Sequence, residues 1–358
     1  MLKDSIKHIY EKFILISVSI ICLYALYLRI MFLSNHTLWA DESLQLSQLQ
    51  GTFLELLKSA PKNFTSLYLS GDIYIVFPFF KIFSYNKYGL AIPHIIVTMI
   101  GFYILYLICK RYFKSIWAYF ITFGIVCFNA TLIEHSTEIR PYAVLPTLAL
   151  ATFYLFERIA DFNFKLNTIK KIWAIVFFIS VILFHVYGIL MFISCFLFTL
   201  LSKYKEKDFK VNFKNAISFT GIILYFAMPL WLYSVFGQPI GANVGINPYA
   251  FIPSPFHNIA GFLKAIFGNL IGFRNLYFLL LGLIIPFIFS YKDKHKQLLF
   301  LCVNIIFPIV FIFLFDIAAG YWFLQRQFIW VMPLFAFFLG WAWDSFFMLL
   351  KRNREKRD

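Results

Sequence analysis

Long apolar segments separated by short polar ones run through the whole sequence. About 17–25 apolar residues are enough for a helix to cross a bilayer, because the hydrocarbon core is about 30 Å thick and each residue adds about 1.5 Å. Segments near that length lie at 13–33, 89–109, 115–133, 142–157, 216–236, 275–290, 298–315 and 328–350. This pattern predicts an all-α integral membrane protein.

The apolar run at 172–201 has two interpretations. As one helix it would be about 45 Å long, which exceeds the hydrocarbon core. As two short helices that turn between His185 and Gly188, it returns the chain to the side from which it came. With that hairpin, most of the 32 Lys and Arg residues fall on one side of the membrane, as expected for cytoplasmic loops. We therefore predict about ten transmembrane helices, with both termini cytoplasmic.

Composition and charge narrow the class of protein. Hydrophobic residues make up 61% of the chain and charged residues 14%, whereas soluble domains are about 45–50% apolar. The formal charge of +15 would also suit nucleic-acid binding, but the Lys and Arg residues lie between the apolar runs. The charge therefore indicates topology and contact with anionic membrane lipid, and no nucleic-acid partner is predicted. We expect one membrane domain over 1–358, in a bacterial cytoplasmic membrane because the loops are short.

Two of the predicted outer loops are long, at 34–88 and 237–274, so we expect function on the outer side. Apolar residues recur at helical spacing over 46–56 in the first loop and over 259–270 in the second, which predicts a helix in the membrane interface in each. The stretch 237–255 is rich in Gly and Pro and has no helical periodicity. It is either a lid over a cavity or an inert surface loop.

The few ionisable residues of the outer segments gather near helix ends. Charges beside lipid are costly unless they face a cavity or a partner, so these residues form the default functional site. They are Asp41, Glu42, Asp72, Glu134, His135, Glu138, Arg140, His185, Asp316 and Arg326. Asp41 and Glu42 follow the first span, where a carboxylate can accept backbone N–H groups and stay ionised. That placement suits a general base, and the alternative is a plain helix cap.

The basic candidates suit binding of an anion. Arg140 can bind a phosphate through two N–H groups while Glu138 holds its guanidinium, or the pair is purely structural. Arg326 contacts the same phosphate or extends to the interface. His185 is either a donor to that phosphate or a polar turn residue. No spacing of His, Cys and carboxylates matches a zinc signature. The acidic pair is compatible with a divalent cation, but the sequence does not indicate one.

Five short motifs, in order along almost the whole chain, resemble the GT-C superfamily of polytopic glycosyltransferases. The resemblance is closest to the protein-mannosyltransferase and aminoarabinose-transferase branch with its RgtA/B/C/D-like members. The motifs are Leu38-Trp39-Ala40-Asp41-Glu42, Ser70-Gly71-Asp72-Ile73-Tyr74 with Gly89-Leu-Ala-Ile-Pro93, His135-Ser-Thr-Glu138-Ile-Arg140-Pro141-Tyr142-Ala143, Phe184-His185-Val186-Tyr187-Gly188, and Gln325-Arg326-Gln327 with Pro333.

The resemblance implies a GT-C-type bundle and an inverting glycosyltransferase that uses a polyprenyl-phosphate-linked sugar. The acceptor would be a hydroxyl of a glycan, a lipid or a protein. It implies catalytic roles for Asp41 and Glu42. Arg140, Arg326, His185 and Tyr142 would bind the donor phosphate, and Glu138, His135 and Asp72 would support them.

The sequence departs from the family pattern at three positions. Asp72 replaces a His-Pro-Pro start, Ile92 stands where the family has Arg, and Gln327 replaces a Tyr. These departures bear on the identity of donor and acceptor more than on the type of reaction.

A membrane transporter or flippase of a lipid-linked or small polar substrate is the alternative. Such a protein would place charges near the bilayer midplane. Here the polar groups gather at one face, and the two charges within spans, Arg29 and Asp344, lie near helix ends. We expect those two to pair or to reach the interface, so the pattern favours an enzyme.

Overall fold

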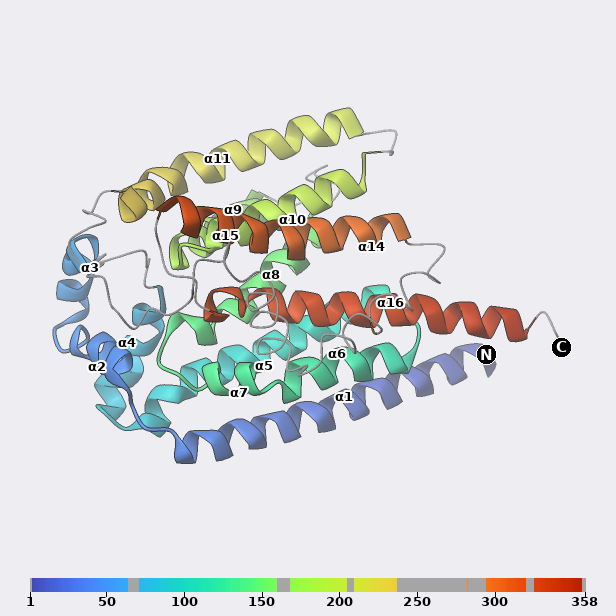
Figure 1. The fold of residues 1–358 in the computed structure, drawn as a ribbon, viewed down its shortest axis with the longest axis horizontal. Coiled ribbons are helices and arrows are strands. Elements are labelled where there is room, and N and C mark those ends of the chain that lie inside the picture. The colour runs from blue at the N-terminus through green and yellow to red at the C-terminus, as the bar shows by residue number, and fades with distance from the viewer. Residues whose placement is uncertain are drawn as a thin grey trace.

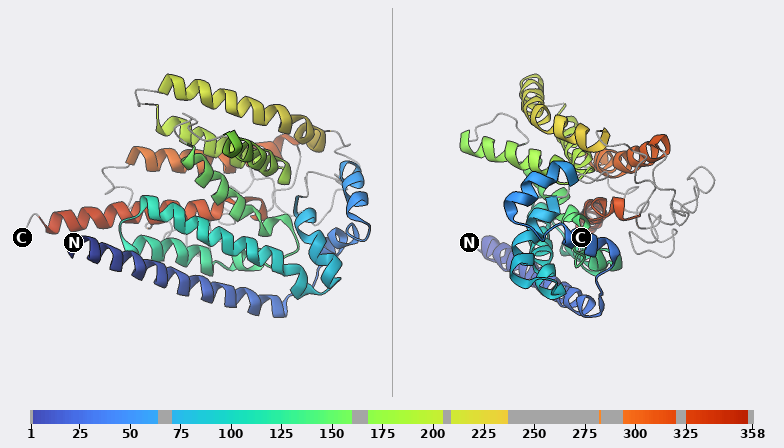
Figure 2. Two further views of the ribbon diagram at one scale, coloured as in Figure 1. Left: turned by 180° about the vertical axis from the view of Figure 1, so that it is seen from behind. Right: turned by 90° about the vertical axis from the view of Figure 1, so that its left-hand side faces the viewer.

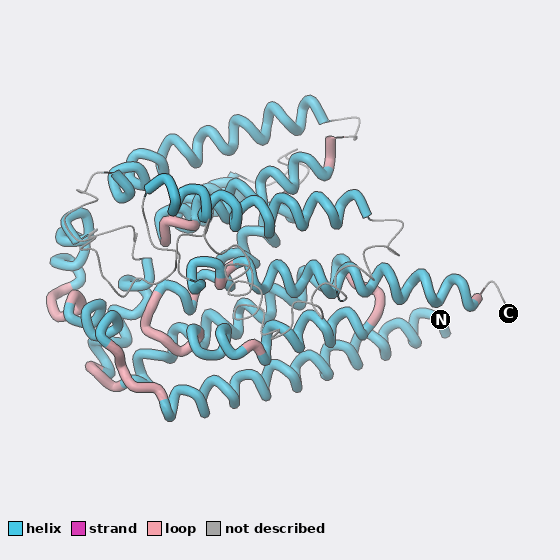
Figure 3. Tube along the Cα trace, in the orientation of Figure 1, coloured by secondary structure: helices cyan, strands magenta, loops and turns pink. Residues whose placement is uncertain are grey.

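The protein is a bundle of helices, seen in a computed structural model that describes residues 2–63, 71–159, 168–204, 209–236, 282, 294–319 and 325–355. Within these ranges every regular element is helical (Figure 3). The long elements are α1 (Leu2–Asn35), α5 (Lys87–Tyr112), α6 (Ile116–Phe128), α8 (Leu145–Arg158), α9 (Thr168–Phe184), α10 (Gly188–Ser202), α11 (Phe209–Phe236), α15 (Phe307–Ala319) and α16 (Val331–Arg354).

Shorter elements connect or extend these helices. They are α2 (Ala40–Ser47), α3 (Phe53–Asn63), α4 (Gly71–Phe83), α7 (Ala130–His135), the 3-10 helices η1 (Pro141–Ala143) and η5 (Gln325–Phe328), α14 (Lys294–Phe300) and the π-helix η4 (Leu301–Ile306). The predicted span 275–290 and the predicted second loop 237–274, with its lid and interfacial helix, lie outside the described residues.

The predicted membrane character is confirmed. Within the described ranges, five helical stretches are long and apolar enough to cross a bilayer: His8–Asn35, Lys87–Tyr112, Phe213–Leu232, Lys294–Leu314 and Val331–Arg354. The predicted turn in the run 172–201 is also confirmed, because α9 ends at Phe184 and α10 begins at Gly188. The predicted span 115–133 is interrupted at Asn129, whose side chain accepts the Leu132 N–H at 2.9 Å and starts α7.

The long helices lie side by side, and the core between them is largely aromatic. In Figures 1 and 2, the start of α1 and the end of α16 lie at one end of the bundle, and α2, α3 and α4 lie at the other. Phe153 of α8 contacts Phe300 of α14 and Phe337 of α16, with ring centroids 5.2 and 5.8 Å apart. Interlocking rings of this kind fix the helix positions more narrowly than contact with lipid alone.

The first long loop does not form the single interfacial helix predicted over 46–56. The chain leaves the helical conformation between Ser47 and Phe53, so two helices replace one. A capping box starts α3, because Glu55 Oε2 accepts the Thr52 N–H at 2.6 Å and Thr52 Oγ1 accepts the Glu55 N–H at 3.2 Å. Leu46, Leu49 and Leu56 are all buried in a small hydrophobic cluster that includes Val76 of α4. This cluster holds α2 and α3 against α4 at the end of the bundle where the candidate site lies.

The turn between α9 and α10 requires glycine at position 188. A Cβ atom there would lie 1.9 Å from the Val181 carbonyl oxygen and 2.7 Å from its carbon, and backbone atoms cannot move aside cheaply. We expect Gly188→Ala to destabilise the protein by about 1–3 kcal/mol or more, the usual effect of overpacking. Thermal unfolding in detergent measures this, with Gly221→Ala in α11 as the control, because nothing lies within 4 Å of that Cβ. Equal melting temperatures for the two variants would contradict the prediction.

Candidate functional site

Glu42 joins three segments of the chain at the start of α2. Its side chain is fully buried, and its Oε2 accepts the Trp39 N–H at 3.1 Å and lies 3.0 Å from His36 Nε2. Its Oε1 accepts the Ile139 N–H at 2.8 Å. Through these hydrogen bonds, the carboxylate fixes the segment after α7 against α2.

Asp41, the preceding residue, faces two arginines instead. Its Oδ2 lies 3.5 Å from Arg140 Nη2 and 3.7 Å from Arg326 Nη2. Arg140 also donates from Nη1 to the Asp41 carbonyl oxygen at 3.4 Å. The Asp41 side chain is 37% exposed, so a dissolved molecule can reach it. The fold thus gathers residues from three distant parts of the sequence around one accessible carboxylate.

Two aromatic rings hold the arginines in place. The Arg140 guanidinium carbon lies 6.0 Å from the Trp39 ring centroid and 5.9 Å from that of Tyr142. For Arg326 the corresponding distances are 5.3 and 5.2 Å. We call Trp39, Arg140, Tyr142 and Arg326 the arginine–aromatic cluster. Cation–π contacts to both rings orient the guanidinium groups without neutralising them, which suits the binding of an anion.

The sequence suggested that Glu138 holds the Arg140 guanidinium. In the structure, Glu138 is paired with His135. His135 Nδ1 lies 2.7 Å from Glu138 Oε2, and Glu138 is 5% exposed. Burial raises the pKa of the Glu138 carboxyl, but the hydrogen bond from His135 and the charges of His135, Arg326 and His36 outweigh it, so that the pKa is below its usual value. Glu138 therefore adds negative charge beside the cluster while it has its own partner.

His185 lies behind Tyr142 in the turn between α9 and α10. Their ring centroids are 5.9 Å apart, and His185 is fully buried. Burial lowers the pKa of His185 to about 3, and the nearby charge of Arg140 contributes to the shift. Its Nδ1 accepts the Tyr187 N–H at 3.3 Å, which places the proton of the neutral ring on Nε2.

Asp72 lies apart from the arginines, in a buried network with His94 and Gln45. His94 Nε2 is 2.7 Å from Asp72 Oδ1, and Gln45 Nε2 donates to Asp72 Oδ2 at 2.6 Å. All three side chains are at most 6% exposed. Since Gln45 belongs to α2, the network ties the helix that carries Asp41 to α4 and α5.

Sequence reasoning missed Trp39, His36 and His94. Trp39 lies two residues before Asp41 in the acidic motif, and this closeness to Asp41 is the feature of the sequence that could have indicated it. His94 follows Pro93 at the end of another quoted motif. The contacts of Trp39 with Arg140 and Arg326, and of His94 with Asp72, join distant parts of the sequence, and no local pattern indicates them. His36, by contrast, contacts Glu42 only six residues away.

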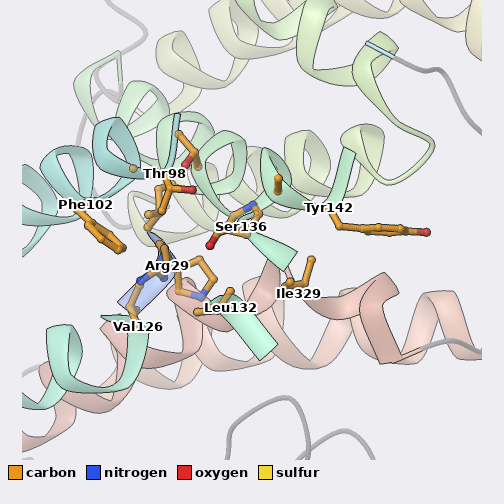
Figure 4. A pocket seen from close by; sticks show the side chains of 14 residues that line it. Arg29, Thr98, Phe102, Val126, Leu132, Ser136, Tyr142 and Ile329 are labelled. Atoms are coloured by element: carbon orange, nitrogen blue, oxygen red, sulfur yellow. The ribbon is translucent and has the colours of Figure 1, made fainter. Parts of the chain in front are cut away.

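A small cavity of about 30 Å³ lies next to the cluster and shares Tyr142 with it (Figure 4). Arg29, which is 1% exposed, lines it from α1 and donates to the carbonyl oxygens of Ala25 and Cys127 at 3.0 and 3.2 Å. Asp344 accepts the N–H groups of Lys114 and Ser115 at 2.9 and 2.6 Å. Both charges within spans therefore bind backbone groups. The expectation that Arg29 reaches the interface or pairs with a charge is wrong, because its Nη1 donates to backbone carbonyls of α1 and α6 inside the bundle.

A metal site receives no support from the described part of the chain. No three His, Cys, Asp or Glu side chains converge there as ligands. The carboxylates nearest the cluster are engaged otherwise, since Asp41 faces guanidinium groups and Glu42 accepts hydrogen bonds on both oxygens.

Comparison with known proteins identifies the fold. No family model and no curated protein matches the sequence. A solved structure does: that of ArnT from Cupriavidus metallidurans in the apo state, with a TM-score of 0.51 and 12% sequence identity over 94% of this chain. The chain has the fold of ArnT. It spans 59% of the length of ArnT, so the likeness covers the bundle and not the whole of that protein. The predicted fold class, an all-α bundle with membrane-spanning helices, is thereby confirmed.

Glu42→Gln tests whether Glu42 organises the site. The amide would place a donor against either the Ile139 or the Trp39 N–H, both of which now donate to the carboxylate. An unsatisfied buried donor costs about 1–3 kcal/mol. We expect a lower melting temperature, since the chain before Arg140 loses its anchor.

Glu55→Gln is the matched control for this change. Glu55 accepts the Thr52 N–H at 2.6 Å in the same kind of helix-start contact, but it is exposed. We expect that variant to change stability by only a few tenths of a kcal/mol, as surface substitutions usually do (about 0.5 or less). If Glu42→Gln behaved like Glu55→Gln, Glu42 would have no organising role.

Proposed function

We propose that the protein is an inverting glycosyltransferase that moves a sugar from a polyprenyl-phosphate-linked donor to an acceptor hydroxyl. The observation that carries this proposal is the Asp41 carboxylate held between the guanidinium groups of Arg140 and Arg326. One accessible base beside two cations suits a reaction in which a hydroxyl loses a proton and a phosphate leaves. The fold shared with ArnT supports the same class of reaction.

The reaction would proceed as a single displacement. The acceptor oxygen attacks the anomeric carbon from the side opposite the phosphate, which inverts that carbon. Asp41 takes the hydroxyl proton, a contribution of about 10²–10⁴-fold. The bond between the anomeric carbon and the phosphate oxygen breaks, and its electron pair stays on the phosphate. Arg140 and Arg326 stabilise the charge that develops there, so a strong general acid is not required.

The geometry favours Asp41 over Glu42 as the base. The side chain of Asp41 is 37% exposed, whereas Glu42 is fully buried with both oxygens accepting hydrogen bonds. Glu42 would then act by placing Asp41 and the loop before Arg140. Tyr142 orients both arginines, and neutral His185 supports Tyr142 from behind.

The arrangement of the bundle indicates which side of the membrane the candidate site would face. The site lies with α2 at the end of the bundle opposite the start of α1 and the end of α16 (Figures 1 and 2). We place the basic chain ends in the cytoplasm of a bacterial inner membrane, following the excess of Lys and Arg in cytoplasmic loops. The site would then face outward, where a glycan, lipid or protein acceptor would meet the donor.

Mass spectrometry of surface glycans tests this function. A strain without the gene would be compared with strains complemented by the wild type or by Asp41→Asn. A sugar-sized mass that is lost on deletion and restored only by the wild type supports the proposal and identifies the product. Full restoration by Asp41→Asn would instead indicate a transporter or scaffold.

A further inference from the structure

We propose that Asp41 also sets the charge of the donor site, so that the site retains a singly charged phosphodiester and releases the more highly charged phosphate monoester formed by transfer. This inference rests on the proposed function, because it concerns the lipid phosphate before and after the sugar leaves. It assigns to Asp41 a role in product release that is separate from proton transfer.

The starting point is the charge balance of the site. Asp41 is one carboxylate between two guanidinium groups, at 3.5 and 3.7 Å. The formal charges of these three side chains sum to +1, and Glu138, which is paired with His135, adds a further negative charge near Arg326. A polyprenyl-phosphate sugar is a phosphodiester with one negative charge, so a bound donor would share the two guanidinium groups with the Asp41 carboxylate.

Neighbouring carboxylates do not share this task. Glu42 is held by Trp39, His36 and Ile139, and Glu138 is held by His135. The two Asp41 contacts are, by contrast, ion pairs to the groups that would bind the phosphate. Among the described residues, Asp41 is thus the carboxylate that forms ion pairs with both arginines, whereas Glu138 is paired with His135 and acts on Arg326 only through its charge.

Transfer changes this balance in two steps. When the bond to the sugar breaks, the phosphate gains one negative charge, and Asp41 gains the acceptor proton and becomes neutral. The total charge that faces the arginines is therefore unchanged. When Asp41 loses that proton to water, the site holds one more negative charge than it held with the donor bound. A phosphate monoester carries about −1.5 to −2 at pH 7, so it is repelled by the restored carboxylate and leaves.

Equilibrium binding of two synthetic lipids tests the inference. Farnesyl phosphate is a monoester and represents the product, and methyl farnesyl phosphate is a diester with the charge of the donor. Both would be titrated into the purified full-length protein in detergent, for the wild type and Asp41→Asn. Asp41→Ser removes the same charge and serves as a second variant. Glu134→Gln is the matched control, because it removes a charge from an exposed residue of α7.

We expect Asp41→Asn to bind farnesyl phosphate about tenfold more tightly than the wild type at pH 7.5. Charges about 5 Å apart interact substantially at an effective dielectric constant near 20, and the exposure of Asp41 reduces the effect. Methyl farnesyl phosphate should gain less, and Glu134→Gln should match the wild type. At pH 5 the monoester loses most of its second charge, whose pKa is about 6, so its gain should fall to that of the diester.

The outcomes separate this inference from the proposed function. If both Asp41 variants bind the two lipids with the wild-type ratio of affinities, or bind the monoester more weakly, charge discrimination by Asp41 is refuted while donor binding stands. If the wild type binds neither lipid, the proposed use of a polyprenyl-phosphate donor fails as well. A change in the ratio that persists at pH 5 would also overturn the inference, because the second charge of the ligand would not be its cause.

Discussion

Replacing Asp41 with asparagine is expected to lower the rate of sugar transfer by about 10²–10⁴-fold, the usual contribution of a general base. Asparagine has nearly the same shape, but it cannot accept the proton of the acceptor hydroxyl. The side chain is 37% exposed and its contacts are two ion pairs, so folding should be preserved. The turnover number and the apparent affinity for the donor, measured with purified protein, check this prediction.

The turnover number and the affinity for lipid phosphate should change in opposite directions in Asp41→Asn. Loss of the base lowers turnover, whereas loss of a negative charge beside the arginines strengthens binding of lipid phosphate. A variant that was merely misfolded would lose both. Glu134→Gln should keep wild-type turnover, because Glu134 is exposed and lies outside the arginine–aromatic cluster. Retention of full turnover by Asp41→Asn would remove Asp41 from the role of base.

Replacing Arg140 with lysine is expected to weaken use of the donor by about tenfold or more, because one good charge-assisted hydrogen bond contributes about 1.5–3 kcal/mol. Lysine keeps the charge but loses the planar fork that can bind a phosphate through two N–H groups. It also loses the stacking on Trp39 and Tyr142, at 6.0 and 5.9 Å. The effect should fall mainly on the Michaelis constant for the donor, measured at saturating acceptor.

Arg158→Lys is the control for the Arg140 prediction. Arg158 stacks on Tyr154 at 5.2 Å and donates to its hydroxyl oxygen, so the substitution breaks the same kind of contact. However, Arg158 is the last residue of α8, whereas Arg140 lies before the first residue of that helix, at its other end. The control should leave donor use unchanged. Wild-type kinetics for Arg140→Lys would exclude Arg140 from phosphate binding.

Much of the bundle was predictable from the sequence, because the membrane imposes a local rule. A backbone in hydrocarbon must satisfy its own hydrogen bonds, so apolar runs of sufficient length become helices wherever they occur. The break between α9 and α10 followed from the length of the apolar run and from the distribution of Lys and Arg. The interruption between α2 and α3 did not follow from the helical spacing of apolar residues over 46–56, because α3 starts anew at the Thr52–Glu55 capping box.

The candidate site divides in the same way. The sequence by itself determined the helical membrane class and the chemistry available near the helix ends, since both depend on residue type and on short-range pattern. Only the tertiary structure decided how those residues combine. Glu42 accepts the Ile139 N–H, and Arg140 and Arg326 both form ion pairs with Asp41. These contacts join residues far apart along the chain, and they depend on how whole helices pack, which no local pattern specifies.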